Sequence, residues 1–179
     1  MSSTAGRRAA YQKALKQNPT SPFPLLQLAR LELLENHADA ALQDLVSAVQ
    51  LKPDYAPAYY LASQIYASQK DFKDAIPAAA KAASFAPDDP IGWYNLGGIA
   101  YVGGDYADAA AAEEQALARN PQFANALYIL GLSYYELKRP ADAIKTFETL
   151  DKLDPGQEIV ATILTNLRAG RAPLPQKGT

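Results

Sequence analysis

Few side chains of this chain could perform covalent, acid–base or metal chemistry. It contains no cysteine, which excludes a thiolate nucleophile and a cysteine-based zinc site. Its single histidine, His37, lies beside Asn36 and Asp39 in a predicted turn, where we expect a solvated residue without a chemical role. No Gly-x-Ser-x-Gly nucleophile motif or glycine-rich phosphate loop occurs, and helix packing and turns account for Gly97–Gly98 and Gly103–Gly104. We therefore predict that the protein is not an enzyme and holds no metal or cofactor.

The tyrosines are the residues best suited to recognising a ligand. Tyrosine combines a large rigid apolar ring with a hydroxyl that can stay hydrated. These properties suit a surface that is soluble when empty and adhesive when filled. Which tyrosines share a surface depends on the elements that carry them.

A repeat of 34 residues organises the chain. Its clearest mark is a series of five prolines at that spacing: Pro19, Pro53, Pro87, Pro121 and Pro155. With each proline at position 32, the sequence divides into four full units, residues 22–55, 56–89, 90–123 and 124–155, preceded by half a unit within residues 1–21. Proline lacks a backbone N–H and disfavours helical geometry in the residue before it, so each proline ends a helix and sets the entry to the next unit.

Each unit predicts a pair of amphipathic helices. Positions 4, 7, 8 and 11 fall on one face of a first helix, and positions 20, 24 and 27 fall on one face of a second. Position 20 is always alanine, and position 8 is alanine, serine or glycine. These small residues allow two backbones to approach closely, while Leu45 and Phe147 at position 24 fill the space beside them. A leucine in place of Gly97 or Gly131 is therefore expected to overpack the contact.

Cap and turn residues place the helix boundaries. Asp71 and Asp105 are predicted N-caps of second helices, and Pro140 is predicted at a first helical position. Pro77 lies inside the second helix of the second unit, where it removes a backbone hydrogen bond. We therefore predict a kink or a late helix start at Pro77.

These columns resemble those of the tetratricopeptide repeat family. The residues that carry the resemblance are Trp93, Leu96, Gly97, Ala109, Ala116 and Pro121, with Tyr66, Tyr134 and Phe147 at the family's aromatic positions. The resemblance implies an all-α fold, a right-handed α-solenoid of antiparallel helix pairs with a C-terminal capping helix. It also implies a role in protein–protein interaction.

The ends of the chain depart from the repeat. Residues 1–21 are predicted to form a half-repeat helix, which either caps the stack or is the remnant of a longer protein. Residues 156–169 carry apolar residues at helical spacing and predict a C-terminal solvating helix over the last apolar face. Residues 170–179 contain prolines and a glycine with little apolar content, so we expect a flexible tail.

The resemblance implies where a ligand binds. In this family first helices line a concave groove, mainly through positions 2, 5, 9, 12 and 13, which on a helical wheel lie beside the core stripe. The candidate binding residues are Leu26, Arg30, Tyr60, Gln64, Tyr94, Asn95, Tyr101, Asn125, Tyr128, Leu132 and Tyr135. The five tyrosines among them either form a ligand-binding surface or merely pack against one another. Chaperone-binding members hold a C-terminal carboxylate with basic and amide residues, and of these only Asn95 has a counterpart here. The remaining clamp positions are Tyr60, Gln64, Asn125 and Ile129, without a lysine or arginine among them, so charge-assisted capture of a carboxylate is not expected.

We therefore predict a non-enzymatic scaffold that binds an apolar or amphipathic peptide or helix of a protein partner in this aromatic groove. Two alternatives stay open. One is a self-associating structural or assembly module that forms a homo-oligomer. The other is the soluble repeat domain of a larger membrane-anchored bacterial protein.

Charge and hydropathy narrow the partners further. The chain has 17 basic and 19 acidic residues and no basic stripe, so a nucleic-acid partner is not expected. Direct membrane insertion is not expected either, because no apolar segment is long enough to span a bilayer. With no signal peptide in the chain as written, we expect a cytoplasmic protein, whereas a domain excised from a longer chain would be periplasmic or membrane-tethered.

Overall fold

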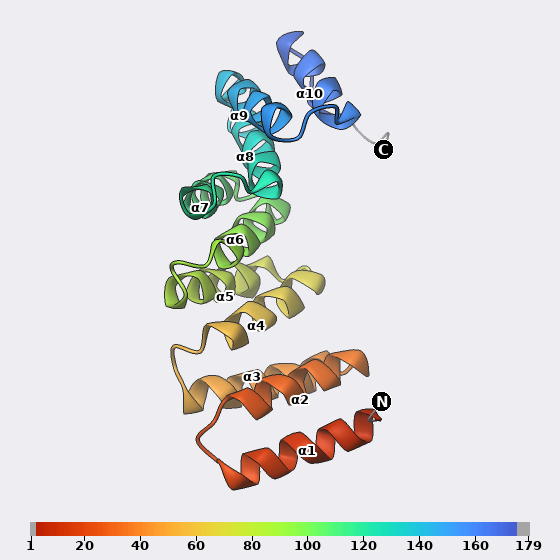
Figure 1. The fold of residues 1–179 in the computed structure, drawn as a ribbon, viewed down its shortest axis with the longest axis vertical. Helices are drawn as coiled ribbons and strands as arrows, with labels where there is room; N and C mark the ends of the chain where they lie inside the picture. The colour runs from red at the N-terminus through yellow and green to blue at the C-terminus, as the bar shows by residue number, and fades with distance from the viewer. Residues whose placement is uncertain (1–2, 175–179) are drawn as a thin grey trace. The chain divides into compact units, whose positions relative to one another are not determined.

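The computed structural model describes residues 3–174, which form ten α-helices and no strand within that range (Figure 1). Short turns connect successive helices, as expected for neighbouring antiparallel helices. The helices are α1 (Thr4–Gln17), α2 (Phe23–Leu34), α3 (Ala38–Leu51), α4 (Ala56–Ser68), α5 (Phe72–Phe85), α6 (Pro90–Gly103), α7 (Tyr106–Arg119), α8 (Ala124–Glu136), α9 (Pro140–Leu153) and α10 (Glu158–Arg168).

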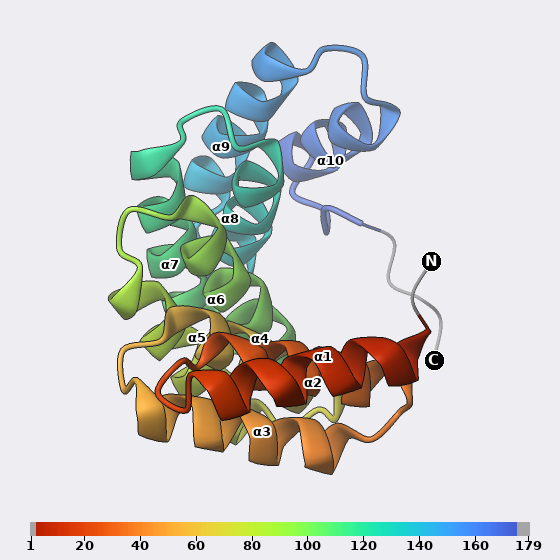
Figure 2. The same cartoon turned by 60° about the horizontal axis from the view of Figure 1, so that its bottom comes forward.

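The chain divides into two compact units, Met1–Ala86 with α1 to α5 and Pro87–Thr179 with α6 to α10. In unit 1, α2 pairs with α3 and α4 with α5; in unit 2, α6 pairs with α7 and α8 with α9. Each of these four pairs falls inside one of the predicted repeat units. The helix α1 lies alongside α2, and α10 packs on α9 (Figure 1 and Figure 2).

Some of the helices begin at a residue whose side chain caps the first turn. The Asp71 carboxylate accepts a hydrogen bond from the Asp74 backbone N–H at 3.4 Å, and the Asp105 carboxylate accepts one from Asp108 at the same distance. Both caps were predicted, and so was Pro140, which opens α9. At the end of α6, Gly104 adopts a left-handed conformation with φ of 87°, which glycine adopts without strain.

Each unit has its own hydrophobic core. In unit 1 the core joins α2, α3 and α4, and in unit 2 it joins α8, α9 and α10. The core residues of unit 1 are Leu25, Leu26, Ala29, Ala41, Leu45, Ala48, Ala58 and Ile65. Those of unit 2 are Leu127, Leu132, Ala143, Phe147, Leu150, Val160, Ile163, Leu164 and Leu167.

Pro77 does not delay the start of its helix. The helix α5 begins at Phe72 and continues through Pro77, so the predicted late start is wrong. Pro77 and Lys73 are both exposed, so the Lys73 carbonyl that loses its helical partner lies on the solvent side, where water can hydrate it. Packing of the opposite face, which includes the fully buried Ala75 and Ala79, offsets the remaining cost.

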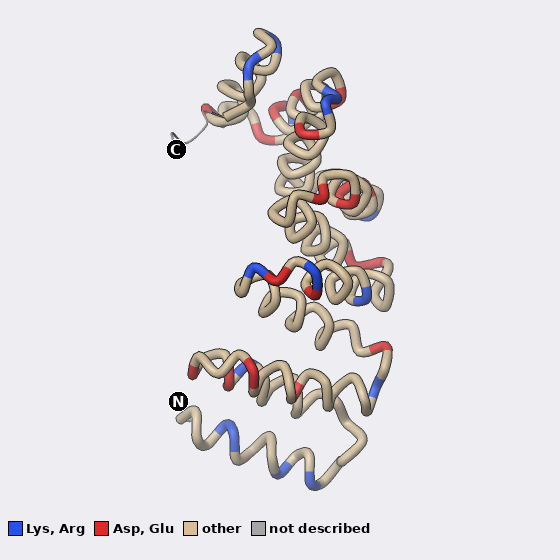
Figure 3. The backbone as a smooth tube through the Cα atoms, turned by 180° about the vertical axis from the view of Figure 1, so that it is seen from behind, with Lys and Arg blue, Asp and Glu red and all other residues tan. Residues whose placement is uncertain are grey.

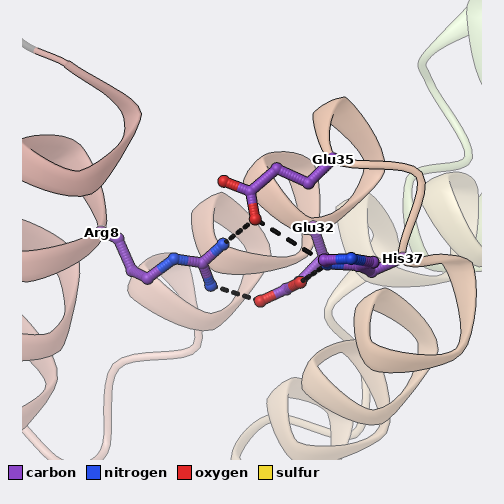
Figure 4. A network of polar contacts seen from close by, with 4 residues as sticks. All are labelled: Arg8, Glu32, Glu35 and His37. Atoms are coloured by element: carbon purple, nitrogen blue, oxygen red, sulfur yellow. Dashed lines mark hydrogen bonds and ion pairs between the residues drawn. The ribbon is translucent and has the colours of Figure 1, made fainter.

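An ion-pair network holds α1 on α2. The two terminal nitrogens of Arg8 pair with the carboxylates of Glu32 and Glu35, the latter at 2.8 Å (Figure 4). His37 Nδ1 lies 3.0 Å from the second carboxylate oxygen of Glu32. The hydrogen bond from Arg8 lowers the pKa of the Glu32 carboxyl. The helix α1 carries lysines and arginines but no acidic residue, so these acids on α2 complement it (Figure 3).

The segment that follows α10 folds back within unit 2. Pro173 is buried, and its carbonyl accepts a hydrogen bond from Asn166 Nδ2 at 3.2 Å. Leu174 packs against the core of unit 2. The tail predicted to be flexible begins at Gly170, so its first five residues, 170–174, lie in contact with the fold instead; the remainder lies outside the described residues.

The contact between Gly131 and Phe147 yields a stability prediction. A Cβ at Gly131 would lie 2.6 Å from Phe147 Cε2, and Phe147 is completely buried, so the ring cannot yield. We expect Gly131→Ala to lower the free energy of unfolding of unit 2 by about 1–3 kcal/mol. Urea unfolding followed by the fluorescence of Trp93, the only tryptophan, measures this unit.

The matched control is Gly98→Ala. A Cβ at Gly98 would meet no atom within 4 Å, so alanine should stabilise the helix by about 0.5–1 kcal/mol. Equal effects of the two substitutions would contradict the close approach at Gly131.

Candidate functional site

Three of the predicted tyrosines of unit 2 gather on one core. Tyr101 of α6 and Tyr128 and Tyr135 of α8 all pack, partly buried, against the core of unit 2. The two helices contact each other directly. Unit 2 therefore brings together three of the four tyrosines that the sequence places at positions 5 and 12 of two successive first helices.

We call the surface of α6 and α8 that carries Tyr94, Tyr101, Tyr128 and Tyr135 the tyrosine face. Each tyrosine of this face has an aromatic or charged neighbour. The ring centroid of Tyr94 lies 4.8 Å from Phe123, that of Tyr101 lies 5.5 Å from Tyr106, and Tyr128 meets Phe147 edge-on at 5.9 Å. Lys138 Nζ lies 5.7 Å from the centre of the Tyr135 ring. One side of each ring is thus engaged by the fold, and these tyrosines stay partly exposed. They are rigid, which lowers the entropy lost when a ligand covers them.

The hydroxyls of this face lie in a weakly solvated environment. Burial raises the pKa of the Tyr101 hydroxyl, and the nearby Glu136, Tyr106 and Tyr128 raise it further. Burial also raises the pKa of Tyr128. Tyr101 and Tyr128 therefore present their hydroxyls in the neutral, hydrogen-bonding form.

Two exposed apolar side chains stand on one side of α6, one near each end of the helix that carries Tyr94 and Tyr101. Ile91 is 46% exposed and Val102 is 70% exposed. The two residues are eleven positions apart, so at 100° per residue they differ by only about 20° around the helix. Gly98 lies between them with open space where a side chain would stand. Large apolar side chains are left in water on the same helix that carries Tyr94 and Tyr101.

A small basic hollow of about 300 Å³ borders Tyr135 in unit 2. Lys138 and Arg171 contribute the charges, and Leu167 and Pro140 contribute apolar walls. Arg171 belongs to the segment that folds back after α10. This hollow adds positive charge at the Tyr135 end of the tyrosine face, where α8 also carries the acidic Glu136.

Two predicted binding residues are not available to a ligand. Leu26 is 3% exposed and Leu132 is 6% exposed, and each belongs to the hydrophobic core of its unit. Position on the helical wheel placed them beside the core, but neighbouring helices cover them.

The remaining predicted residues are at least partly accessible. In unit 1, Arg30 and Gln64 are exposed and Tyr60 is half-buried; in unit 2, Asn125 is exposed and Asn95 is half-buried.

Two sequence models of the tetratricopeptide repeat match the chain. One matches residues 32–96, and the other matches residues 83–118 and 94–158. The chain belongs to the tetratricopeptide repeat (TPR) family. No curated protein matches this TPR chain in sequence. No helix in the described part of the chain combines the length and the apolar content that crossing a membrane requires.

Solved structures of TPR proteins share the fold. The crystal structure of YrrB, described as a TPR protein with an unusual peptide-binding site, has a TM-score of 0.79 at 22% identity, covering 90% of this chain and 83% of YrrB. The crystal structure of MamA has a TM-score of 0.73 at 25% identity, covering 84% and 82% of the two chains. The first TPR of Spaghetti (RPAP3), bound to the HSP90 peptide SRMEEVD, has a TM-score of 0.58 at 20% identity, covering 64% of this chain and 94% of its own length. These likenesses confirm the predicted class, an all-α solenoid of helix pairs.

The third TPR unit carries a buried acid that the sequence analysis missed. Glu113 of α7 has no exposed surface, and neither of its carboxylate oxygens has a hydrogen-bond partner. A Cβ at Gly97 would lie 2.4 Å from Glu113 Oε1, so the carboxyl group lies directly against the backbone of α6. Burial raises the pKa of Glu113 from its ordinary value of 4.5 to about 9. The group is therefore a neutral carboxylic acid at physiological pH.

The repeat columns hold the signal that could have found this residue. Glu113 stands at position 24, where the other units carry Leu45, Ala79 and Phe147. A glutamate in a column of apolar residues predicts a buried carboxyl. Whether the carboxyl finds a hydrogen-bond partner depends on the neighbouring helices, so only the structure shows that it has none.

One cluster of side chains has the composition of a metal site. The ligand atoms of Glu32, Glu35 and His37 in unit 1 lie within 4.8 Å of one another. The Arg8 guanidinium already pairs with both carboxylates, so a cation would have to displace it (Figure 4). The arrangement is better explained as the ion-pair network that holds α1.

Glu113 makes the stability of unit 2 depend on pH. Its folded-state pKa is raised, so the folded unit keeps a proton that the unfolded chain releases between about pH 4.5 and pH 9. Stability is thus highest below this window and falls as the pH rises through it. We expect Glu113→Gln to remove this fall, a difference of about 1.4 kcal/mol per pH unit between variant and wild type.

Urea unfolding of both proteins at a series of pH values, followed by Trp93 fluorescence, measures the difference. Asp151→Asn on α9 is the control, because Asp151 is partly exposed and its loss should leave the pH dependence unchanged. Parallel curves for wild type and Glu113→Gln would show that the carboxyl is hydrated or paired.

Proposed function

We propose that the first-helix face of unit 2 binds an apolar or amphipathic peptide or helix of a protein partner. The observation that carries this proposal is the exposure of two apolar side chains of α6, Ile91 and Val102, on the helix that also carries half-buried tyrosines. Exposed apolar side chains next to rigid aromatic rings are typical of interaction surfaces. The scaffold role that TPR proteins commonly have agrees with this choice.

The known neighbours support a peptide as the class of ligand. YrrB is described as having a peptide-binding site, and the RPAP3 domain was solved with an HSP90 peptide. That HSP90 peptide, SRMEEVD, is acidic. The helix α6 contains no charged residue, and the only one in α8 is Glu136. Burial of apolar surface rather than charge pairing should therefore dominate binding here.

The basic hollow adds a directional element to this proposal. Lys138 and Arg171 lie at the Tyr135 end of the face, where they can pair with an acidic group of the bound segment. A partner with an apolar stretch and an acid at one end fits the face best. The hydroxyls of Tyr101 and Tyr128 can hydrogen-bond its backbone.

The test uses peptides selected from a random library for binding to the wild-type chain. The double variant Ile91→Ser/Val102→Ser should weaken their binding at least tenfold, because about 1.4 kcal/mol of lost apolar burial corresponds to a factor of ten. Fluorescence anisotropy with labelled peptides gives both affinities. Tyr128→Ala is less suitable, because Tyr128 packs on Phe147 and its removal opens the core.

The control is Ile159→Ser on α10. Ile159 is 46% exposed, the same fraction as Ile91, but lies outside the tyrosine face. Its replacement should leave affinity unchanged. Equal losses of affinity for the two variants, or no loss for either, would show that the peptide does not bind on α6. The tyrosines would then serve only to pack the helices.

A further inference from the structure

A groove of about 290 Å³ crosses unit 1 on helices that the proposed function does not use. It lies between α3 and α5, with α4 as its floor. Each wall is a stripe of residues at helical spacing: Leu42, Leu45, Val46 and Val49 on α3, and Asp74, Pro77, Ala78 and Lys81 on α5. The side chain of Val46 is 52% exposed although it is aliphatic.

The groove exists because one repeat column is underfilled. Position 7 is leucine in three units, Leu28, Leu96 and Leu130, but it is Ala62 in the second unit. Ala62 lines the floor of the groove, so the branched end of a leucine side chain is missing at this point. The opposite wall contributes another small residue, Ala78. The small residue at this position therefore deepens the groove, and a leucine in its place would occupy part of the floor.

Two charged residues stand at opposite ends of the groove wall that α5 forms. Asp74 lies in the first turn of α5, and Lys81 lies seven residues later on the same stripe, about 10 Å along the helix axis. At that separation the two side chains do not neutralise each other. Lys81 Nζ stands 5.2 Å from the centre of the Tyr59 ring, which holds the ammonium group beside the groove.

We propose that this groove docks an amphipathic helix of a protein partner, lying antiparallel to α5. Two helical turns of aliphatic side chains fit between the leucine and valine stripe of α3 and the floor of α4. An acidic residue near the start of the partner helix pairs with Lys81, and a basic residue near its end pairs with Asp74. This polarity also suits the partner's own helix dipole, which favours acids at its start and bases at its end.

The open form of the groove favours a helix over a small molecule. Small-molecule sites enclose most of the ligand surface, and this volume is at the lower end of their range. A helix needs only one face covered. The groove and the tyrosine face lie on different helices of different units, so failure of one proposal does not affect the other.

The probe is a labelled alanine-based peptide of about 18 residues, long enough to be partly helical in water. It carries leucines at i, i+4 and i+7, with a glutamate before them and a lysine after them. A second peptide has the glutamate and the lysine exchanged. Fluorescence anisotropy measures binding of both peptides to the full chain.

We expect Ala62→Leu to weaken binding of the first peptide at least tenfold, because the leucine fills the floor. This variant should fold, since three other units carry leucine at the same position; circular dichroism and thermal unfolding check it. The exchanged peptide should bind the wild type about fivefold more weakly than the first. It should bind the double variant Asp74→Lys/Lys81→Glu better than the first peptide does.

Three results would overturn the proposal. Equal binding to wild type and Ala62→Leu would place the peptide elsewhere. Displacement of the peptide by octanoate, with no preference between the two peptides, would assign the groove to small amphiphiles. A dimer in sedimentation that Ala62→Leu converts to monomer would assign the groove to a second copy of this chain.

Discussion

The helix pairs of this protein depend on a fixed space where the first and second helices of a repeat cross. Alanine occupies position 20 in all four units, and all four alanines are completely buried. Because the side chain at position 20 is only a methyl group, the side chains at positions 8 and 24 occupy the rest of the space between the two helices. The bulky Phe147 lies against Gly131, and Glu113 lies against Gly97. In the first two units position 8 carries a side chain: Ala29 accompanies Leu45, and Ser63 accompanies Ala79.

This fixed separation of the helices bears on two unusual residues, Ala62 and Glu113, because the helices do not shift to compensate for a side chain of atypical size or polarity. When backbones are already in contact, a missing side chain cannot be compensated by a closer approach of the helices. Ala62 therefore leaves an open groove between α3 and α5. Glu113 lies in the same kind of crossing, against the backbone of α6, where it is completely buried. The acid stays unpartnered and neutral inside unit 2.

The features that the sequence predicted correctly depend on local backbone chemistry. Proline spacing and the N-caps Asp71 and Asp105 act within a few residues, so they place helices without knowledge of their neighbours. Burial at the edge of a helix face is different. Leu26 and Leu132 point beside the core stripe, and only the position of the next helix decides whether water reaches them. The same holds for Arg8, whose acidic partners lie 24 and 27 residues away in sequence.

Composition was a poor guide to the segment after α10 for a related reason. A stretch with prolines and glycine has no helical or strand preference, yet a single buried proline and one hydrogen bond from Asn166 hold it against unit 2. Periodicity carries no signal for such contacts. The basic hollow beside Tyr135 depends on Arg171 in this segment, so the charge at that end of the face could not be read from the repeat columns.

Some repeat positions are not constrained by the crossing of the two helices, and their residues can differ from unit to unit. Positions 2 and 13 of a first helix face away from its second helix, so their residues can change without disturbing the pair. In α6 they are Ile91 and Val102, and in α8 they are Asn125 and Glu136. The face of unit 2 is thus apolar on one helix and polar on the next, although both helices share the same core columns. An extended ligand lying across both helices would meet this change of polarity along its length, so its two possible directions would not be equivalent.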